Sequence, residues 1–314
     1  MDFQLTQEQR DLRAGVRDLL AGRYGREALR ASLDAGGADD EGASDPSVRV
    51  VDRRLWRELG DAGLFALRLP ESEGGVGLGL PEAVLAFEEA GRVLLPGPLV
   101  ATHLAAGVVP GAAQGTVVVT ARDLGGGLVT YLGEVDAVLG ADGVPAGSPV
   151  RSVDPLTPLH RVSPSAEADC PPHTHRSEGA LLTAALQVGS ALRTVELAVR
   201  YAGEREQFGQ PIGAFQAVKH LCARMLVRAE VARTAVYAAA VTGDPGEVAA
   251  AKLLADEAAV RCARDCLQVH GGMGFTWEAD VHLHLKRAWL RAEQWRTAGE
   301  AEEALAAELL SSAG

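Results

Sequence analysis

The residues of this chain best placed to do chemistry include Arg205, Phe208 and Gln216, in the segment YAGEREQFGQPIGAFQAVKH. Arg205 stands at the end of one helical pattern, and Gln216 stands at the start of the next. A guanidinium group beside the free amides of a helix N-terminus binds phosphate well, and the Phe208 ring can cover a flat ligand ring. The alternative is that Arg205 pairs with Glu204 or Glu206 and that Phe208 fills a hydrophobic contact.

A second candidate segment, QVHGGMGFTW, contains Gln268 followed by Gly271 and Gly272 at the end of an apolar helical pattern. The glutamine amide offers both donors and an acceptor. Two adjacent glycines indicate either a left-handed helix cap or a backbone that a ligand touches. Because the segment is not GxGxxG and follows a helix rather than a strand, it is not a Rossmann-type dinucleotide fingerprint.

Other kinds of site find little support in the spacing of residues. His282 and His284, like His173 and His175, form HxH pairs, but no Cys, Asp or Glu cluster stands at metal spacing, so no metal site is predicted. The four cysteines lack CxxC spacing and are expected to be ordinary core or surface thiols. No GxSxG or Walker A motif occurs.

The bulk composition narrows the class of protein. The chain has 314 residues, 47% of them hydrophobic, and a net charge of -12. The hydrophobic content predicts a globular protein, and the acidic balance argues against binding nucleic acid or an anionic membrane surface. An anionic small ligand, which needs only a few local cations or amides, stays possible. Because neither a signal-type start nor a long apolar run is present, a cytoplasmic location is expected.

The elements that must position the two segments fall into three predicted domains. Residues 1–112 form a helical domain in which Thr6 caps the first helix. Residues 113–172 contain short β-branched runs separated by Gly, Asp and Pro, which predict a small β domain. Residues 173–314 carry long helical patterns with short connections, which predict a four-helix bundle. The expected fold class is mainly α.

The helices of the bundle can be located more closely. After a linker, SAEADCPPHTHRSEG, the first is expected to begin near residue 178, and two more are expected at about 214–241 and 246–269. One or two helices follow residue 279. The apolar stripe of the first bundle helix has the 3.6-residue period of a buried face and consists of Leu181, Ala185, Val188, Leu192, Val195 and Val199.

Taken together, REQFGQPIGAFQAVKH and QVHGGMGFTWEADVHLHLKRA closely resemble the C-terminal signature of the acyl-CoA dehydrogenase family. MDFQLTQEQRDLRAGVRDLLAGRYG and LWRELGDAGLFALRLPESEGGVGLG resemble its N-terminal helical domain. The resemblance implies a helical N-terminal domain, a β middle domain and a C-terminal four-helix bundle that forms dimers and tetramers. It also implies FAD and an acyl-CoA substrate, from which a Glu base takes the α-proton while the flavin N5 accepts hydride.

The same resemblance assigns roles to the two segments. In this family they reach the pyrophosphate and adenine part of an FAD that is seated mainly in the neighbouring subunit. That role agrees with the chemistry of an Arg fork, a covering ring and glycines that permit close approach. The residues implied to contact FAD are Arg205, Phe208, Gln216, Gln268, Gly271 and Gly272.

The chain departs from the family at the residues that do the chemistry. The Thr-Glu-Pro…Gly-Ser-Asp and Trp-Ile-Thr stretches that hold the flavin ring are absent between residues 100 and 175, so the β domain is shortened. Counting on from HLHLKRAW puts one family position of the base near Trp295, and counting back from Arg205 puts the other at Gly179. The nearest carboxylates are Glu293 and Glu178, and a one-residue offset on a helix turns a side chain by about 100°.

This pattern resembles the short, reduced subunit of actinobacterial heteromeric acyl-CoA dehydrogenases, which act in steroid side-chain or related acyl-CoA breakdown. There a reduced chain pairs with a full-length subunit in a heterotetramer. The chain is therefore expected to complete the FAD site of a catalytic partner. Two alternatives remain: a self-sufficient homo-oligomeric enzyme that uses Glu178 or Glu293 as base, and a non-redox scaffold that binds acyl-CoA or a protein.

Overall fold

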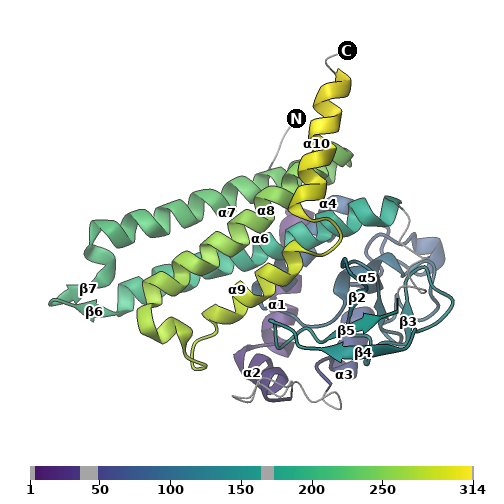
Figure 1. Ribbon diagram of the computed structural model, residues 1–314, viewed down its shortest axis with the longest axis horizontal. Coiled ribbons are helices and arrows are strands. Elements are labelled where there is room, and N and C mark those ends of the chain that lie inside the picture. The colour runs from purple at the N-terminus through teal and green to yellow at the C-terminus, as the bar shows by residue number, and fades with distance from the viewer. Residues whose placement is uncertain (1–3, 36–48, 164–172, 313–314) are drawn as a thin grey trace.

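Four helices lie side by side in the computed structural model, which describes residues 4–35, 49–163 and 173–312 (Figure 1). A small β segment lies near one end of them, and α10 (Ala298–Ser312) projects away from the body. This arrangement confirms the predicted four-helix bundle. Its helices are α6 (His173–Glu204), α7 (Gln216–Thr242), α8 (Pro245–His270) and α9 (Val281–Ala292).

Local signals set the ends of the bundle helices. Gly243 ends α7 with a left-handed φ of 66°, and the Asp244 side chain accepts hydrogen bonds from the backbone N–H groups of Gly246 and Glu247 to begin α8. The apolar stripe on α6 is buried as predicted except at Val199, which is 54% exposed because it lies near the free end of the helix.

One predicted boundary in this region was wrong. The first bundle helix begins at His173 rather than near residue 178, so the end of the expected linker is helical. The segment after the proline pair at 171–172 contains no helix breaker before Gly179, which sits within the helix. Polar composition was therefore mistaken for irregular structure.

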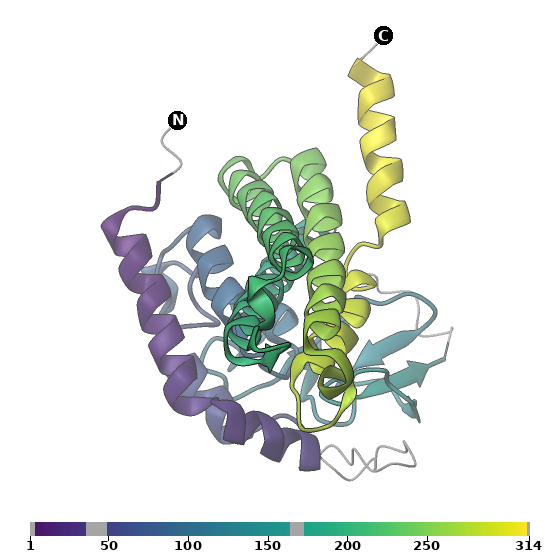
Figure 2. The ribbon, with the colours of Figure 1, turned by 90° about the vertical axis from the view of Figure 1, so that its left-hand side faces the viewer.

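The N-terminal helices wrap one side of the bundle, where α1 and α2 follow each other along its outer surface (Figure 2). Thr6 forms a reciprocal capping box with Gln9, which confirms its predicted role. Pro81 lies in the first turn of its helix, where its missing N–H costs no hydrogen bond. The helices are α1 (Gln7–Arg23), α2 (Arg26–Ala35), α3 (Arg53–Asp61), α4 (Leu80–Arg92) and α5 (Leu99–Leu104).

Helices α4 and α6 meet backbone to backbone through two glycines. A Cβ atom added at Gly91 would lie 2.1 Å from the carbonyl oxygen of Leu186, and one added at Gly189 would lie 1.9 Å from that of Glu88. Only glycine permits such an approach. The N-terminal helices and the bundle consequently share one hydrophobic core.

The β segment consists of very short strands. β2 (Leu128–Thr130), β5 (Leu159–Val162) and β4 (Gly147–Val150) form an antiparallel sheet in that order, and β1 (Val119–Thr120) pairs in parallel with β3 (Ala137–Val138). Short 3-10 turns occur at Glu71–Glu73, Ile212–Ala214 and Gly271–Phe275. Within the described ranges, no helix combines the length and apolar character needed to cross a bilayer.

Candidate functional site

The two segments singled out from the sequence meet at one end of the bundle, which we call the bundle tip. Helices α6 and α8 both end there, at Glu204 and His270. The rings of Tyr201 and His270 stack with their centroids 4.2 Å apart and their planes inclined by 22°. Side chains about 70 residues apart in sequence thus join the two segments into one surface.

Phe208 occupies the turn of a hairpin at the bundle tip, between β6 (Glu206–Gln207) and β7 (Gln210–Pro211). Phe208 and Gly209 have φ angles of 54° and 77°, which is the pattern of a two-residue type I′ turn. Asn or Gly normally takes the first of these positions, and a bulky side chain is strained there. Phe208 is nevertheless 92% exposed, so its ring is held in solvent at a conformational cost. Strain of this kind is common where a side chain contacts a ligand or partner.

Gly271 combines the two roles that the sequence left open. It caps α8, with its N–H donating to the carbonyl of Gln268, and its φ of 59° and ψ of -141° suit only glycine. A Cβ atom added at Gly271 or Gly272 would meet nothing within 4 Å. The backbone is therefore both a helix terminus and open to a ligand.

The polar residues among those implied to contact FAD also face solvent. Arg205, Gln216 and Gln268 are exposed, and Arg205 forms no ion pair among the residues that the structure describes. The alternative pairing of Arg205 with a neighbouring glutamate is thus not observed. Helix α7 begins without a side-chain cap, and in the described part of the chain the N–H groups of Gln216 and Ala217 have no hydrogen-bond acceptor.

Two residues that sequence reasoning missed hold the connection that follows the glycines. Arg26 donates to the Asp280 carboxylate (Nε–Oδ2, 2.8 Å) and to the carbonyl of Glu278 (2.8 Å), while Arg30 donates to Asp280 and to the carbonyl of Trp277. We call these contacts the α2 clamp. Partners about 250 residues apart leave no periodic signal in the sequence.

The two positions counted for the catalytic base converge in space. A Cβ atom added at Gly179 on α6 would lie 2.2 Å from Cδ2 of the Trp295 indole. Trp295 is 2% exposed, and its backbone N–H donates to the carbonyl of Asp123 at 2.7 Å. The indole ring therefore fills the place where a carboxylate from either position would stand.

The two candidate carboxylates lie beside this place but not in it. Both oxygens of Glu178 accept hydrogen bonds from Arg68, at 2.7 and 3.1 Å, and both side chains are half-buried. Glu293 is exposed at the C-terminal end of α9. Glu178 is thus held by Arg68, whereas Glu293 faces solvent.

A cavity of only about 30 Å³ remains where the β segment, α5, α6 and the end of α9 meet. It is lined by Thr130, Tyr131, Arg291 and Trp295, among others. This is room for about one water molecule, whereas organic ligands occupy pockets of about 300 Å³ or more. Asp123 also lines it and accepts from Gln294 at 2.8 Å; burial raises the pKa of the Asp123 carboxyl to about 7.

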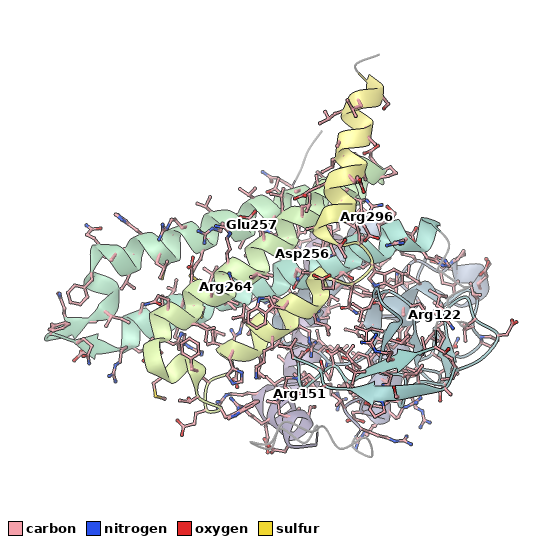
Figure 3. All side chains as sticks on the ribbon, viewed as in Figure 1. Arg122, Arg151, Asp256, Glu257, Arg264 and Arg296 are labelled. Atoms are coloured by element: carbon pink, nitrogen blue, oxygen red, sulfur yellow. The ribbon has the colours of Figure 1, made fainter. Side chains whose placement is uncertain are left out.

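Two other buried polar clusters in the bundle are held by hydrogen bonds. Asp256 on α8 (labelled in Figure 3) accepts from Lys252 at 2.5 Å and from Gln187 at 3.1 Å, and Lys252 also donates to the carbonyl of Arg291. His284 bonds Ser190 at 2.8 Å. Among the described residues no three His, Cys, Asp or Glu side chains are close enough to hold a metal ion.

Comparison with known proteins places the chain in a family. Two family models match it: "Acyl-CoA dehydrogenase, N-terminal domain" over residues 6–122, and "Acyl-CoA dehydrogenase, C-terminal domain" over residues 177–303. Acyl-CoA dehydrogenase IpdE2 of Mycobacterium tuberculosis is 36% identical over 301 residues, which cover 90% of this chain and 91% of the relative. The chain belongs to the acyl-CoA dehydrogenase family.

Two further matches show how the acyl-CoA dehydrogenase fold recurs. Acyl-CoA dehydrogenase FadE34 of M. tuberculosis is 33% identical over 88% of this chain, and the match spans 45% of that longer protein. A chain of the ChsE4-ChsE5 complex from M. tuberculosis superposes with a TM-score of 0.81 at 25% identity, over 99% of each chain. The resemblance inferred from the sequence is confirmed.

As a family member the chain is part of an oxidoreductase acting on the CH–CH bond of an acyl-CoA, with FAD as cofactor. The residues that the structure describes fit part of that cofactor. The exposed arginine, ring and open glycine backbone at the bundle tip suit the ADP half of FAD. The flavin ring does not fit in the cavity at Trp295, which is roughly one-tenth of the smallest usual ligand pocket.

Proposed function

We propose that this chain is the partner subunit of a heteromeric acyl-CoA dehydrogenase and completes the FAD site of a full-length catalytic subunit. The observation that carries the proposal is the Trp295 ring packed against Gly179, at the place counted for the base. A chain with an exposed tip motif and a filled catalytic centre can contribute FAD contacts to a neighbouring subunit but has no place for a base of its own.

In this proposal each tip residue acts on the ADP half of the partner's cofactor. Arg205 and the free N–H groups at the start of α7 bind the pyrophosphate, with Gln216 and Gln268 donating beside them. Phe208 covers the adenine, and Gly271 and Gly272 allow the cofactor to touch the backbone. When bound, FAD accepts hydride from the acyl-CoA; the flavin ring and the base belong to the catalytic subunit.

The relatives support a heteromeric assembly. ChsE4 and ChsE5, one chain of which shares this fold, are described together as a complex. We further propose that the partner is a full-length acyl-CoA dehydrogenase subunit, that the complex is cytoplasmic and that its substrate is an acyl-CoA. The domain limits 1–112, 113–172 and 173–314 are retained as part of it; the two family-model matches leave residues 123–176 between them.

The proposal is tested by expressing the chain alone and together with a full-length acyl-CoA dehydrogenase subunit, then measuring flavin absorbance of the purified species. We expect the chain alone to be colourless and the complex to hold FAD. Arg205→Ala should remove most of the FAD from the complex, whereas Arg54→Ala, at an exposed position on α3, should not.

Two results would overturn the proposal. If the chain alone bound FAD stoichiometrically and an acyl-CoA bleached it, the chain would be self-sufficient, and Glu178→Gln and Glu293→Gln would identify the base. If the complex formed but stayed colourless, the chain would be a scaffold without a redox role.

A further inference from the structure

A second and much larger cavity, of about 510 Å³, lies between the α1–α2 pair and the bundle, where α4, α6 and α9 form its other walls. It contains neither the tip residues Arg205 and Phe208 nor Trp295. We call it the α1 cavity. Its volume lies within the range of sites that bind small organic molecules.

Arginine dominates the charged lining of the α1 cavity. Of its lining residues, Glu89 and Asp280 are the acidic ones, and the basic guanidinium groups belong to Arg17, Arg26, Arg92, Arg193 and Arg200. Such a concentration of positive charge is unexpected on a chain with a net charge of -12. A cleft lined by one sign of charge concentrates ligands of the other sign.

Some of this charge is already neutralised, and some is not. Arg17 and Arg92 both bind Glu89, at 2.6 and 3.4 Å, and Arg26 binds Asp280 at 2.8 Å. Glu196, outside the lining, pairs with Arg92 at 2.6 Å and with Arg193 at 3.1 Å. Arg30, also outside the lining, pairs with Asp280, so six arginines stand against three carboxylates and leave an excess of three positive charges.

Arg200 is the cation best placed to receive a ligand. It is exposed on α6, lines the cavity and forms no ion pair among the residues that the structure describes. Arg193, almost two helical turns earlier on the same helix, pairs with the exposed Glu196 and with no other carboxylate in the described ranges. An anion entering here gains charge-assisted hydrogen bonds without breaking the buried pairs at Glu89.

The rest of the lining is mostly apolar, with Tyr24 and His284 as its polar members. Val93 at the end of α4 and Leu197 on α6 are half-buried, so they keep apolar surface that a ligand can contact. A purely polar anion would leave this surface without a contact, and a purely apolar molecule would leave the arginines unsatisfied. Both requirements are met by a molecule with an apolar body and an anionic head.

We propose that the α1 cavity binds an amphipathic organic anion, whose apolar body lies against Val93 and Leu197 and whose carboxylate or phosphate head is held by Arg193 and Arg200. The site is separate from the FAD surface, and the proposal does not rest on the chain being a partner subunit. Asp280 belongs both to this lining and to the α2 clamp, so the site adjoins the connection that follows Gly271–Gly272.

The test is isothermal titration calorimetry of the purified chain, alone or in complex with its partner subunit, with decanoate and with decyl phosphate. We expect at least one of these anions to bind, and the stronger one identifies the head group. Decyltrimethylammonium tests the sign of the charge, and inorganic phosphate tests the need for an apolar body; both should bind at least about tenfold more weakly.

Single substitutions distinguish binding in the α1 cavity from non-specific attraction by surface charge. Arg200→Gln should weaken binding by about tenfold, because one charge-assisted contact is lost, and Leu197→Asp should weaken it further. Arg10→Gln, at an exposed position on α1 outside the cavity, is the matched control and should leave binding unchanged. Circular dichroism checks that each variant is folded.

The proposal is overturned by any of three results: neither anion binds, the cationic amphiphile binds as tightly as decanoate, or Arg200→Gln binds as tightly as the parent chain. Binding that Arg10→Gln weakens as much as Arg200→Gln would also overturn it, because the effect would then reflect overall charge.

Discussion

At the scale of single residues, Trp295 and Gly179 depend on each other. Trp295 has a φ of 63°, a left-handed conformation that costs an ordinary residue about 1–2 kcal/mol. Burying the indole ring recovers more than this, since truncating a buried Trp costs about 3–5 kcal/mol. The ring can be buried only because position 179 has no side chain.

Gly179→Ala should destabilise the chain by about 2–3 kcal/mol, because its Cβ would overlap the indole ring. Adding Trp295→Gly should relieve that overlap, so the double variant should be less destabilised than the sum of the single ones. Urea unfolding measures all three. Gly203→Ala, on the same helix with nothing within 4 Å of its Cβ, is the control; if it behaved like Gly179→Ala, the packing account would be wrong.

Asp123 makes stability depend on pH. Its folded pKa of about 7 lies above the ordinary value of 3.8 because burial disfavours the charged form. The folded chain therefore keeps a proton that the unfolded chain has released, and this stabilisation, complete below about pH 4, is lost as the pH rises through 7.

Asp123→Asn cannot ionise, so its stability relative to the parent should rise by about 2 kcal/mol between about pH 4 and about pH 7.5. This is roughly half of what the full shift would give, because the residue as a whole is only half-buried. Urea midpoints across this pH range measure it, with Asp142→Asn, at an exposed position, as the control. A pH-independent difference would contradict the assignment.

At the scale of elements, the β6–β7 hairpin keeps an aromatic ring exposed at a conformational cost. An Asn-Gly pair is the favoured sequence for its turn, and Phe208-Gly209 replaces it. A hairpin selected for stability alone would not carry this ring. We therefore expect stability and cofactor binding to respond in opposite directions to substitution.

Phe208→Asn should stabilise the isolated chain by about 1 kcal/mol, since Asn tolerates the left-handed conformation. In the heteromeric complex it should lower FAD affinity by about tenfold, through loss of a stacking contact. Phe208→Leu removes the ring but keeps the strain, so it should lose FAD without gaining stability. Thermal melts and FAD titration measure the two effects; unchanged FAD affinity in both variants would exclude a role for the ring.

At the scale of the whole molecule, the Gly91–Gly189 seam joins the N-terminal helices to the bundle, and one hydrophobic core extends across it. A shared core predicts that the two parts unfold together. Trp56 reports on the N-terminal helices and Trp295 on the C-terminal part, so fluorescence samples both sides of the seam.

Urea transitions followed by tryptophan fluorescence and by far-ultraviolet circular dichroism should therefore coincide. Gly91→Ala should lower the common midpoint, by a free energy of about 3 kcal/mol, because its Cβ would overlap the Leu186 carbonyl. Gly15→Ala, on α1 with open space around its Cβ, should not lower it. Two separate transitions in the parent chain would show that the seam does not couple the parts.

What the sequence by itself determined was local or periodic. Thr6, Gly243 and Asp244 act on the backbone within a few residues, so helix ends could be predicted from them, and the α6 stripe could be predicted from its period. The family followed from short contiguous segments. The start of α6 was missed because polar composition does not by itself stop a helix.

Only the tertiary structure decided what happens between distant residues. The place of the base is filled because Trp295 meets Gly179 across 116 positions of chain, and the α2 clamp and the α1 cavity likewise join helices that are far apart in sequence. Contacts of this kind depend on how helices approach one another. These contacts cannot be predicted from the sequence because the approach of one helix to another depends on packing over the whole core. No local pattern of residues encodes that packing.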